Sequence, residues 1–193
     1  MTSPVRVIKV GGSLLGWKDL PTALTGWLVQ QSPAVHVLIA GGGEYVEAIR
    51  RADATYGLGE EAAHWLCVDV LSVTARLLGE IVNANTVMHA QELPSLAPAF
   101  CVFDPAAFLR NVEPLQFSES LPHTWAVSSD SIAARIAESL VASELVLLKS
   151  CLPAAGAGYV DDYFPVAAAR LPHIRCVNLR SREFEEIIWD SRP

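Results

Sequence analysis

The chain has 193 residues, of which 51% are hydrophobic and 18% are charged, and its formal net charge is -7. This length and composition describe a globular protein of one large or two small domains, and they exclude the disordered and fibrous classes. The acidic balance, with a sequence pI near 5.2, excludes a broad surface for nucleic acid or for an anionic membrane, because such surfaces need clustered Lys and Arg. Any phosphate group must therefore be bound by a local site.

The basic residues and the cysteines limit which kinds of binding site the chain can form. Only three of the 14 basic residues are lysines, and these are Lys9, Lys18 and Lys149. The four cysteines lack C-x-x-C spacing and the histidine pattern of a zinc site, so we expect buried free thiols and no protein-bound metal at Cys67, Cys101, Cys151 and Cys176. The chain shows no signal-peptide layout and no run near the roughly 20 apolar residues of a membrane span, so we expect a cytoplasmic protein.

Short apolar runs rich in β-branched residues predict six strands, at residues 5–10, 35–40, 99–103, 124–127, 145–149 and 174–178. Nearly continuous apolar runs of this length are typical of strands that are covered on both faces. Helical patterns predict helices at residues 21–31, 44–56, 60–83, 131–142, 164–170 and 182–190. The alternation of strand and helix indicates βαβ units and an α/β fold with a mostly parallel sheet.

Two segments suggest how the chain is organised. The helix expected at 60–83 carries two apolar stripes, so it is either a central core helix or one that also forms a homodimer interface. Residues 89–123 are richer in proline and have a looser period, which predicts connections that cross between two lobes.

The first candidate site is a strand that runs into two glycines and a serine, with Lys9 followed by Gly11, Gly12 and Ser13. Glycines allow a backbone to approach a ligand closely, and their N–H groups with the Ser13 hydroxyl can surround an anion. Ligands of open α/β sheets bind beside the carboxyl ends of strands, where Lys9 stands. The spacing is neither that of a Walker A loop nor that of a dinucleotide site. The alternative is an ordinary tight turn with an exposed lysine.

The second candidate site is the glycine run after the next strand, at Gly41, Gly42 and Gly43, directly before a helix. A helix N-terminus with such a run is suited to an anion or a polar substrate. Two glycine loops at the ends of successive strands imply two neighbouring binding positions.

The third candidate site is the cluster of Ser128, Ser129, Asp130 and Ser131 before a helix. Such residues can simply be helix caps, each worth about 1 kcal/mol. An aspartate at this place would repel phosphate unless it holds a lysine, and Lys9 is the candidate partner.

The fourth candidate is Lys149, which closes an otherwise apolar strand and so points to the ligand edge of the sheet. The alternative is a lysine that extends into solvent. Gly156, Gly158 and residues 160–162 follow, and we expect a loop there that folds over a nucleotide.

Together these motifs resemble the amino acid kinase superfamily. The resemblance rests on K-x-G-G-S at 9–13, the glycine loop at 41–43, S-S-D-S-I-A at 128–133 and the strand and loop at 145–161. Residues 51–53 and 63–65 are most similar to the small archaeal-type branch that includes the aminomethylfuran phosphate kinase of methanofuran biosynthesis. Uridylate kinases are more distant relatives.

The resemblance implies a three-layer αβα sandwich in which residues 1–123 bind the phosphoryl acceptor and residues 124–193 bind ATP with Mg²⁺. It implies a kinase that transfers the γ-phosphoryl group of ATP to a phosphate or carboxylate, for this branch in methanofuran-type cofactor biosynthesis. The expectation of a homodimer rests only on the two apolar stripes of the helix at 60–83. The segment after Asp161 is short for the family, so a non-catalytic nucleotide-binding or regulatory protein is the alternative. A binding protein for another anion is a third possibility.

The resemblance also assigns roles to single residues. Lys9 would contact the transferred phosphoryl group, Lys149 the nucleotide, and Asp130 would orient both lysines. Arg51 and Asp53 are candidates for acceptor recognition, unless they only belong to a surface helix pair. The set expected to bind substrate and phosphate is Gly11, Gly12, Ser13, Gly41, Gly42, Gly43, Arg51, Asp53 and Ser129.

Overall fold

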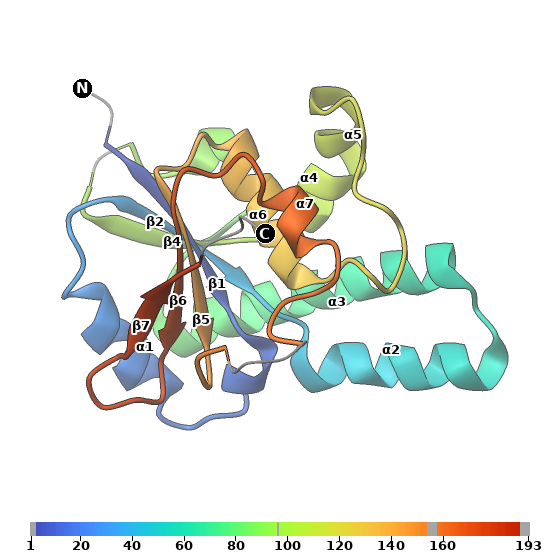
Figure 1. Ribbon diagram of the computed structural model, residues 1–193, viewed down its shortest axis with the longest axis horizontal. Helices are drawn as coiled ribbons and strands as arrows, with labels where there is room; N and C mark the ends of the chain where they lie inside the picture. Colours follow the sequence, from blue (N-terminus) through green and yellow to red (C-terminus); the bar gives the residue numbers. More distant parts are fainter. Residues whose placement is uncertain (1–2, 96, 154–157, 190–193) are drawn as a thin grey trace.

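A computed structural model describes residues 3–95, 97–153 and 158–189. The described strands form one sheet in the order β3-β4-β2-β1-β5-β6-β7, in which only β7 is antiparallel to its neighbour (Figure 1). They are β1 (Val5–Val10), β2 (Val35–Ala40), β3 (Thr86–Val87), β4 (Ala99–Phe103), β5 (Glu144–Lys149), β6 (Ile174–Asn178) and β7 (Glu186–Ile188).

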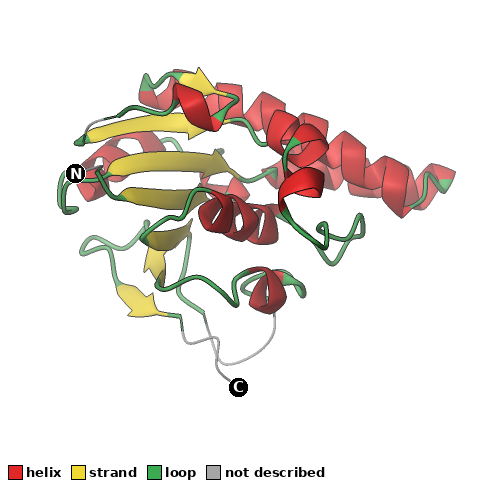
Figure 2. Ribbon diagram, turned by 90° about the horizontal axis from the view of Figure 1, so that it is seen from above, coloured by secondary structure: helices red, strands yellow, loops and turns green. Residues whose placement is uncertain are grey.

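Helices lie on both faces of this sheet (Figure 2). They are α1 (Leu20–Leu28), α2 (Gly43–Tyr56), α3 (Glu60–Val82), α4 (Ala106–Asn111), α5 (Glu113–Gln116), α6 (Ser129–Ser139) and α7 (Phe164–Ala167), with 3-10 turns η1 (Gly12–Leu14) and η2 (Ala90–Glu92). The arrangement is the expected three-layer αβα sandwich.

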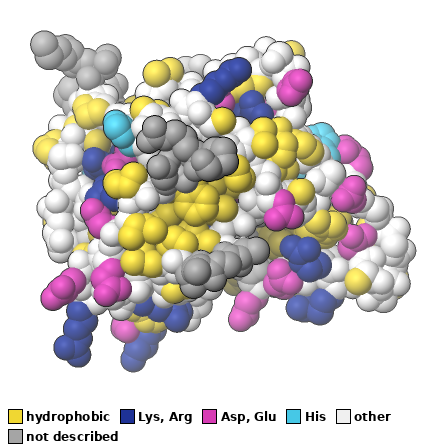
Figure 3. Space-filling view, viewed as in Figure 1, with side chains coloured by type: hydrophobic (Ala, Val, Ile, Leu, Met, Phe, Trp, Pro, Cys, Tyr) yellow, Lys and Arg dark blue, Asp and Glu magenta, His cyan; other side chains and the backbone are white. Residues whose placement is uncertain are grey.

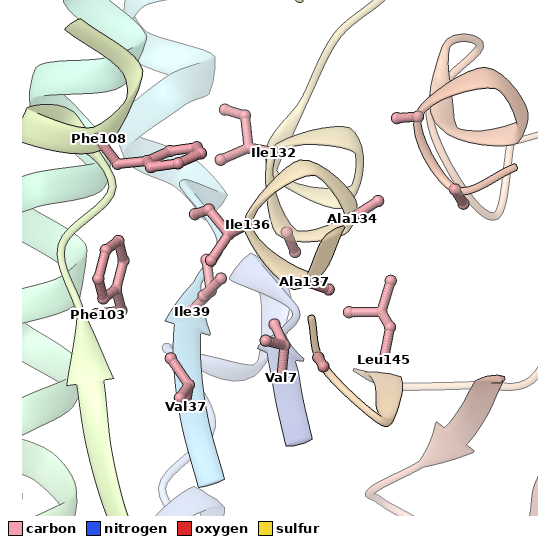
Figure 4. Packing of buried hydrophobic residues seen from close by; sticks show 14 of the residues in the cluster. Val7, Val37, Ile39, Phe103, Phe108, Ile132, Ala134, Ile136, Ala137 and Leu145 are labelled. Atoms are coloured by element: carbon pink, nitrogen blue, oxygen red, sulfur yellow. The ribbon is translucent and has the colours of Figure 1, made fainter. Parts of the chain in front are cut away.

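Successive side chains of the central strands point to opposite faces and so build two cores. On one face, Val7 and Ile39 pack with Ile132 and Ile136 of α6 and with Phe108 of α4 (Figure 4). All five are buried, which places the start of α6 firmly over the carboxyl ends of β1 and β2.

The second core lies on the opposite face of the sheet. Ile8 and Leu38 pack there with Trp27 of α1 and with Leu78 of α3. Helix α3 therefore contributes to both cores, because Leu71, from its middle turns, belongs to the first. The core interpretation of this helix is confirmed.

Helices α2 and α3 form a long antiparallel pair that extends beyond the sheet (Figure 1). Gly57, in the left-handed conformation at φ 62°, ends α2 and lets the chain reverse. Leu66 and Val73 of α3 are exposed. Whether they form a homodimer interface stays a prediction.

Residues 124–127 do not form the strand that their apolar character predicts. They form a turn in which the Val127 N–H donates to the Thr124 carbonyl at 3.2 Å. The segment is not part of the seven-stranded sheet and leads directly into Ser128, the N-cap of α6. Val127 is nevertheless buried, because its side chain packs into the core between the sheet and α6 without belonging to a strand.

The helix predicted at 182–190 is wrong. Residues Glu186–Ile188 form β7, and Cys176 of β6 pairs with Ile187. The N–H of Trp189 donates to the carbonyl of Ile174 at 2.9 Å, which extends this antiparallel pairing. Adjacent β-branched residues favour a strand, and the edge of the sheet supplies the partner. Residue 190 lies outside the described residues.

The described residues between 89 and 123, which leave out residue 96, are more ordered than the expected loose connections. They contain β4, α4 and α5. Asp104 fixes the turn between β4 and α4, because its carboxylate accepts hydrogen bonds from the Ala106 N–H at 3.0 Å and from the Ser72 hydroxyl at 2.7 Å. The helix expected at 164–170 is the single turn α7.

All four cysteines are free thiols, as predicted, but only two of them are buried. Burial raises the pKa of the Cys101 and Cys176 thiols to about 11. Cys67 is half-buried, and Cys151 is exposed because it lies in the connection after β5. The prediction of buried thiols is therefore wrong for Cys151.

The surface is mixed in charge on the face seen in Figure 3, where Lys and Arg side chains are interspersed with Asp and Glu. Among the helices that the structure describes, none combines the length and the apolar character needed to cross a membrane.

Candidate active site

The centre of the candidate site is a carboxylate between two lysines. Lys9 Nζ lies 2.8 Å from Asp130 Oδ1, and Lys149 Nζ lies 2.8 Å from Asp130 Oδ2. Strands β1 and β5 are parallel neighbours, so their carboxyl ends bring both lysines to one edge, while the first turn of α6 supplies Asp130. The Lys9 and Asp130 side chains are nearly buried, at 7% and 6% exposure. We call this unit the lysine bridge.

Burial and the neighbouring charges act in opposite directions on the pKa values of Asp130 and Lys149. Burial alone would raise the pKa of the Asp130 carboxyl, but the two ammonium groups outweigh it and lower the pKa. Burial lowers the pKa of Lys149, and Asp130 opposes that effect. A carboxylate flanked by two cations leaves one net positive charge, which favours a bound anion.

The two glycine loops meet backbone to backbone beside the lysine bridge. A Cβ atom on Gly12 would lie 2.2 Å from the backbone nitrogen of Gly43, and one on Gly41 would lie 2.6 Å from that of Gly12. Gly43 also adopts a φ of 54°. Side chains at these positions would therefore separate the loops, and glycine is required here by close approach. On the other side, Gly11 donates its N–H to the Leu148 carbonyl at 2.8 Å.

The start of α2 presents free donors to this site. In the described part of the chain, no side chain caps the helix at Gly42 or the 3-10 turn at Gly11. The first N–H groups of a helix have no partner within the helix, so they are available to an anion. The Ser13 hydroxyl lies at the exposed rim, 3.5 Å from the hydroxyl of Ser150.

The start of α6 is capped in a different way. The Ser128 hydroxyl accepts from the N–H of Asp130 at 3.3 Å, which confirms a capping role for one of the three serines. The carboxylate of Asp161 accepts hydrogen bonds from both Ser128 and Ser131. Ser129 is half-buried and faces the adjoining cavity.

A cavity of about 510 Å³ opens from the lysine bridge between α2, α3 and the segment before α6. Lys9 and the glycine loops form one end of it. Its middle is apolar, with Val68 and Ile132 among the walls, and its far end carries Arg50 and Trp125. The lining residues are Lys9, Gly12, Ser13, Gly42, Gly43, Glu44, Val46, Glu47, Arg50, Glu60, His64, Cys67, Val68, Leu71, Thr124, Trp125, Val127, Ser128, Ser129 and Ile132.

Arg51 and Asp53 are not brought to the cavity wall. Arg51 is exposed on α2. Asp53 accepts hydrogen bonds from the Trp125 indole N–H at 2.9 Å and from the Gly59 N–H at 3.0 Å, so it fixes the end of the helix pair and the Trp125 ring. The neighbouring Arg50 reaches the cavity instead, with its guanidinium carbon 4.2 Å from the centre of the Trp125 ring.

His64 is a cavity residue that the sequence did not single out as a site residue. It is buried and stacks on His123, with ring centres 4.4 Å apart and planes at 20°. Burial, together with the nearby His123, lowers the pKa of His64 to about 4. His64 therefore offers a neutral imidazole to the cavity at neutral pH. Its helical spacing from Val68 and Leu71, which also line the cavity, is the signal that could have found it.

The opposite side of the lysine bridge faces the segment after β5. Lys149 Nζ donates a hydrogen bond to the Tyr159 carbonyl and lies 4.4 Å from the centre of the Tyr159 ring. Arg180, just after β6, donates to the Ser13 carbonyl at 3.5 Å. Gly158 has a φ of 100°, while the expected glycine at 156 lies outside the described residues.

Within the described ranges, no group of three or more His, Cys, Asp or Glu side chains is arranged to hold a metal ion. Asp130, the carboxylate of the lysine bridge, has each of its oxygens against a lysine. A divalent cation at this site would therefore depend on ligands that come with the substrate.

The comparison with protein-family models found no match. The curated [5-(aminomethyl)furan-3-yl]methyl phosphate kinase of Methanocaldococcus jannaschii is 23% identical to this chain over 146 residues. The alignment covers 74% of this chain and 64% of that protein, so the chain spans less than two thirds of the length of its curated relative.

Solved structures of uridylate kinases have a similar fold. UMP kinase from Ureaplasma parvum matches with a TM-score of 0.61 and 13% identity, over 94% of this chain and 92% of that one. UMP kinase from Bacillus anthracis matches with a TM-score of 0.63 and 8% identity, over 98% and 100%. Uridylate kinase from Archaeoglobus fulgidus matches with a TM-score of 0.54 and 17% identity, over 80% and 66%.

The structural matches show the fold alone, and the sequence match adds a relative in the branch to which residues 51–53 and 63–65 point. Together they confirm the resemblance of this chain to the amino acid kinase superfamily and to its small archaeal-type branch.

Proposed function

We propose that this protein is a small-molecule kinase that transfers the γ-phosphoryl group of ATP to a phosphate or carboxylate acceptor. The observation that carries the proposal is the lysine bridge, which lies beside two glycine loops at the carboxyl edge of a parallel sheet. Phosphoryl transfer depends mostly on positioning and on neutralising the charge of the transferred group. Two ammonium groups and uncapped backbone N–H groups supply both.

The reaction needs no protein base if the acceptor is already an anion. An acceptor oxygen forms a bond to the γ-phosphorus, while the bond from that phosphorus to the bridging oxygen breaks and its electrons leave with ADP. Lys9 would contact the transferred group from the acceptor side, and Lys149 from the nucleotide side. Asp130 would keep both ammonium groups in place.

We propose that the two substrates approach from the two halves of the sheet. Strands β1 to β4 fall within residues 1–123 and lie on one side, and β5 to β7 fall within 124–193 and lie on the other. The acceptor would occupy the cavity, and ATP the edge beyond Lys149. Mg²⁺ would enter with ATP, held by phosphate oxygens, as is usual for this cation, and it would supply further neutralisation of phosphate charge.

The cavity favours an acceptor with an anionic group at one end and a flat apolar body. Its lysine and glycine end suits a phosphate, and its apolar middle leads to Trp125 and the neutral His64. The names of the relatives give acceptors of this kind, namely UMP and [5-(aminomethyl)furan-3-yl]methyl phosphate. We propose a phosphate monoester of this size as the acceptor, with methanofuran-type cofactor biosynthesis as the setting.

The test is release of ADP from MgATP in the presence of UMP, [5-(aminomethyl)furan-3-yl]methyl phosphate and acidic amino acids, each in turn. Lys9→Ala is expected to lower turnover by about 100-fold or more, with an unchanged circular dichroism spectrum. Lys18→Ala, at the exposed third lysine, is the matched control.

Unchanged turnover in Lys9→Ala would overturn the proposal. Calorimetric binding of ATP without ADP release for every acceptor would instead favour the non-catalytic nucleotide-binding protein.

A further inference from the structure

Asp161 accepts four hydrogen bonds from the start of α6. Its Oδ2 accepts from the Ser128 N–H at 2.9 Å, from the Ser128 hydroxyl at 2.7 Å and from the Ser131 N–H at 3.0 Å. Its Oδ1 accepts from the Ser131 hydroxyl. The segment after β5 therefore contacts α6 through one carboxylate with four donors.

These contacts add to the local cap by Ser128 and take the place of the two hydrogen bonds of a capping box. In a capping box, the N-cap side chain accepts from the third residue of the helix, whose own side chain accepts from the N-cap N–H. Here Ser128 is the N-cap and Ser131 is the third residue, and neither bond is made between them. Asp161 takes both N–H groups, although it lies 30 residues further along the chain. The start of α6 thus depends on a distant segment.

The same contacts fix the proton of the Ser128 hydroxyl. Because that hydroxyl donates to Asp161, it accepts from the N–H of Asp130 at 3.3 Å. Asp130 is the next residue but one, and its carboxylate stands between the two lysines. Asp161 is therefore connected to the lysine bridge through the Ser128 hydroxyl and the backbone N–H of Asp130.

The segment that carries Asp161 is attached at both ends of this contact. Before it, the Tyr159 carbonyl accepts from Lys149 Nζ. After it, the Tyr163 N–H donates to the Ala126 carbonyl at 3.2 Å. The segment thus joins the lysine at the end of β5 to the wall of the acceptor cavity, which Ser128 lines.

We propose that Asp161 is a positioning residue that fixes the start of α6 and so holds Asp130 between Lys9 and Lys149. Its consequence for turnover rests on the proposed kinase function. Its consequence for the lysine bridge does not, because that geometry exists without substrate.

The chain offers an unusually clean readout, since it contains only three lysines. Selective ¹³C labelling of lysine gives three sets of Cε signals in an NMR spectrum. In Asp161→Asn, which keeps the shape but loses the charge and one acceptor oxygen, the signals of Lys9 and Lys149 are expected to shift. The signal of exposed Lys18 is expected to stay, and Asp162→Asn, at the exposed neighbour, should move none of them.

Unmoved Lys9 and Lys149 signals in folded Asp161→Asn would overturn the proposal. Should that variant fail to fold, Ser131→Ala removes a single donor to Asp161 and keeps the backbone bond. The same two signals are then expected to shift by less and in the same direction, and their failure to move would also overturn it.

Kinetics separates positioning from nucleotide binding. For Asp161→Asn we expect kcat to fall by about 10- to 100-fold, because small misplacement of charged groups has effects of that order, while KM for MgATP changes by less than about threefold. A raised KM with unchanged kcat would contradict a positioning role. If the wild-type protein released no ADP with any acceptor, the kinase proposal would fail, and the lysine signals would still decide the role of Asp161.

Discussion

A carboxylate lies between two basic side chains at each end of the neighbouring strands β1 and β5. At the carboxyl end this is the lysine bridge. At the amino end, Glu144 Oε2 lies 2.6 Å from Arg6 Nε and Oε1 lies 3.0 Å from Arg175 Nε. We call this second unit the arginine bridge. Both units are nearly buried, so burial alone does not tell them apart.

The two bridges differ in the net charge and in the hydrogen-bond donors that remain available to a ligand. In the arginine bridge, Arg6 also donates to Ser32, and Arg175 to Gln31 and to a second carboxylate, Glu186. Its charges therefore balance and its donors are used within the protein. The lysine bridge has one excess positive charge and lies beside uncapped backbone N–H groups and a cavity. Excess charge and uncommitted donors, rather than ion pairs as such, mark the candidate site.

Matched substitutions of the two carboxylates test this difference most strongly. Asp130→Asn and Glu144→Gln each leave two cations without their shared counterion, and each is expected to lower the free energy of unfolding by about 3 kcal/mol. Only Asp130→Asn should also lower turnover per folded molecule, by about 100-fold, because Lys9 and Lys149 lose their common anchor. Urea denaturation and ADP release measure the two effects separately.

The proposed difference between the two bridges would be contradicted if Glu144→Gln lowered turnover as strongly as Asp130→Asn at equal folded fraction. It would also be contradicted if Asp130→Asn kept full turnover, because the lysine bridge would then be structural like its counterpart.

Much of the lysine bridge could be predicted from sequence because its parts are local. Each glycine loop follows its own strand, and the carboxyl ends of parallel strands share one edge. The expectation that Asp130 holds Lys9 needed only the charge argument that an aspartate at a phosphate site must be neutralised. The ion pair at 2.8 Å confirms it.

The remaining features depend on contacts between distant segments. The strand Glu186–Ile188 exists because the edge of β6 is open to it, and a local pattern does not contain that information. The pairing of Asp161 with Ser128 spans 33 positions. Arg50 rather than Arg51 lines the cavity, and Arg51 is exposed on α2. A one-residue difference on a helix turns a side chain by about 100°, and sequence alone did not fix that rotation.

Acidification should affect the arginine end of the sheet through His36. Burial, and then the charge of Arg6, lowers the pKa of His36 to about 4, while Glu144 opposes this. In the unfolded chain, His36 takes up a proton near its ordinary pKa of 6.5, whereas in the folded protein it stays neutral down to about pH 4. The free energy of unfolding is therefore unaffected by His36 above pH 6.5 and falls as the pH decreases from 6.5 towards 4. Between pH 7 and pH 5 the loss is about 2 kcal/mol. The measurement is urea unfolding at both pH values.

The variant His36→Gln should reduce this pH-dependent loss by about the same 2 kcal/mol. His173→Gln, at an exposed histidine, should leave it unchanged. An equal pH dependence in wild type and His36→Gln would show that His36 does not stay neutral beside the arginine bridge.

The smallest expected effect concerns the contact between the glycine loops at the lysine end. Gly12→Ala would place a Cβ atom 2.2 Å from the Gly43 nitrogen. Because that nitrogen is a backbone atom and the Cβ is bonded directly to the Gly12 Cα, the loops must separate. We expect a loss of about 1–2 kcal/mol in the free energy of unfolding and a lower turnover, because the donors then move away from Lys9. Gly16→Ala is the matched control in the same connection, since its Cβ would meet no atom within 4 Å. Equal unfolding midpoints for the two variants would mean that the glycine loops can move apart at no cost. Close backbone contact would then not be what positions the N–H donors beside Lys9.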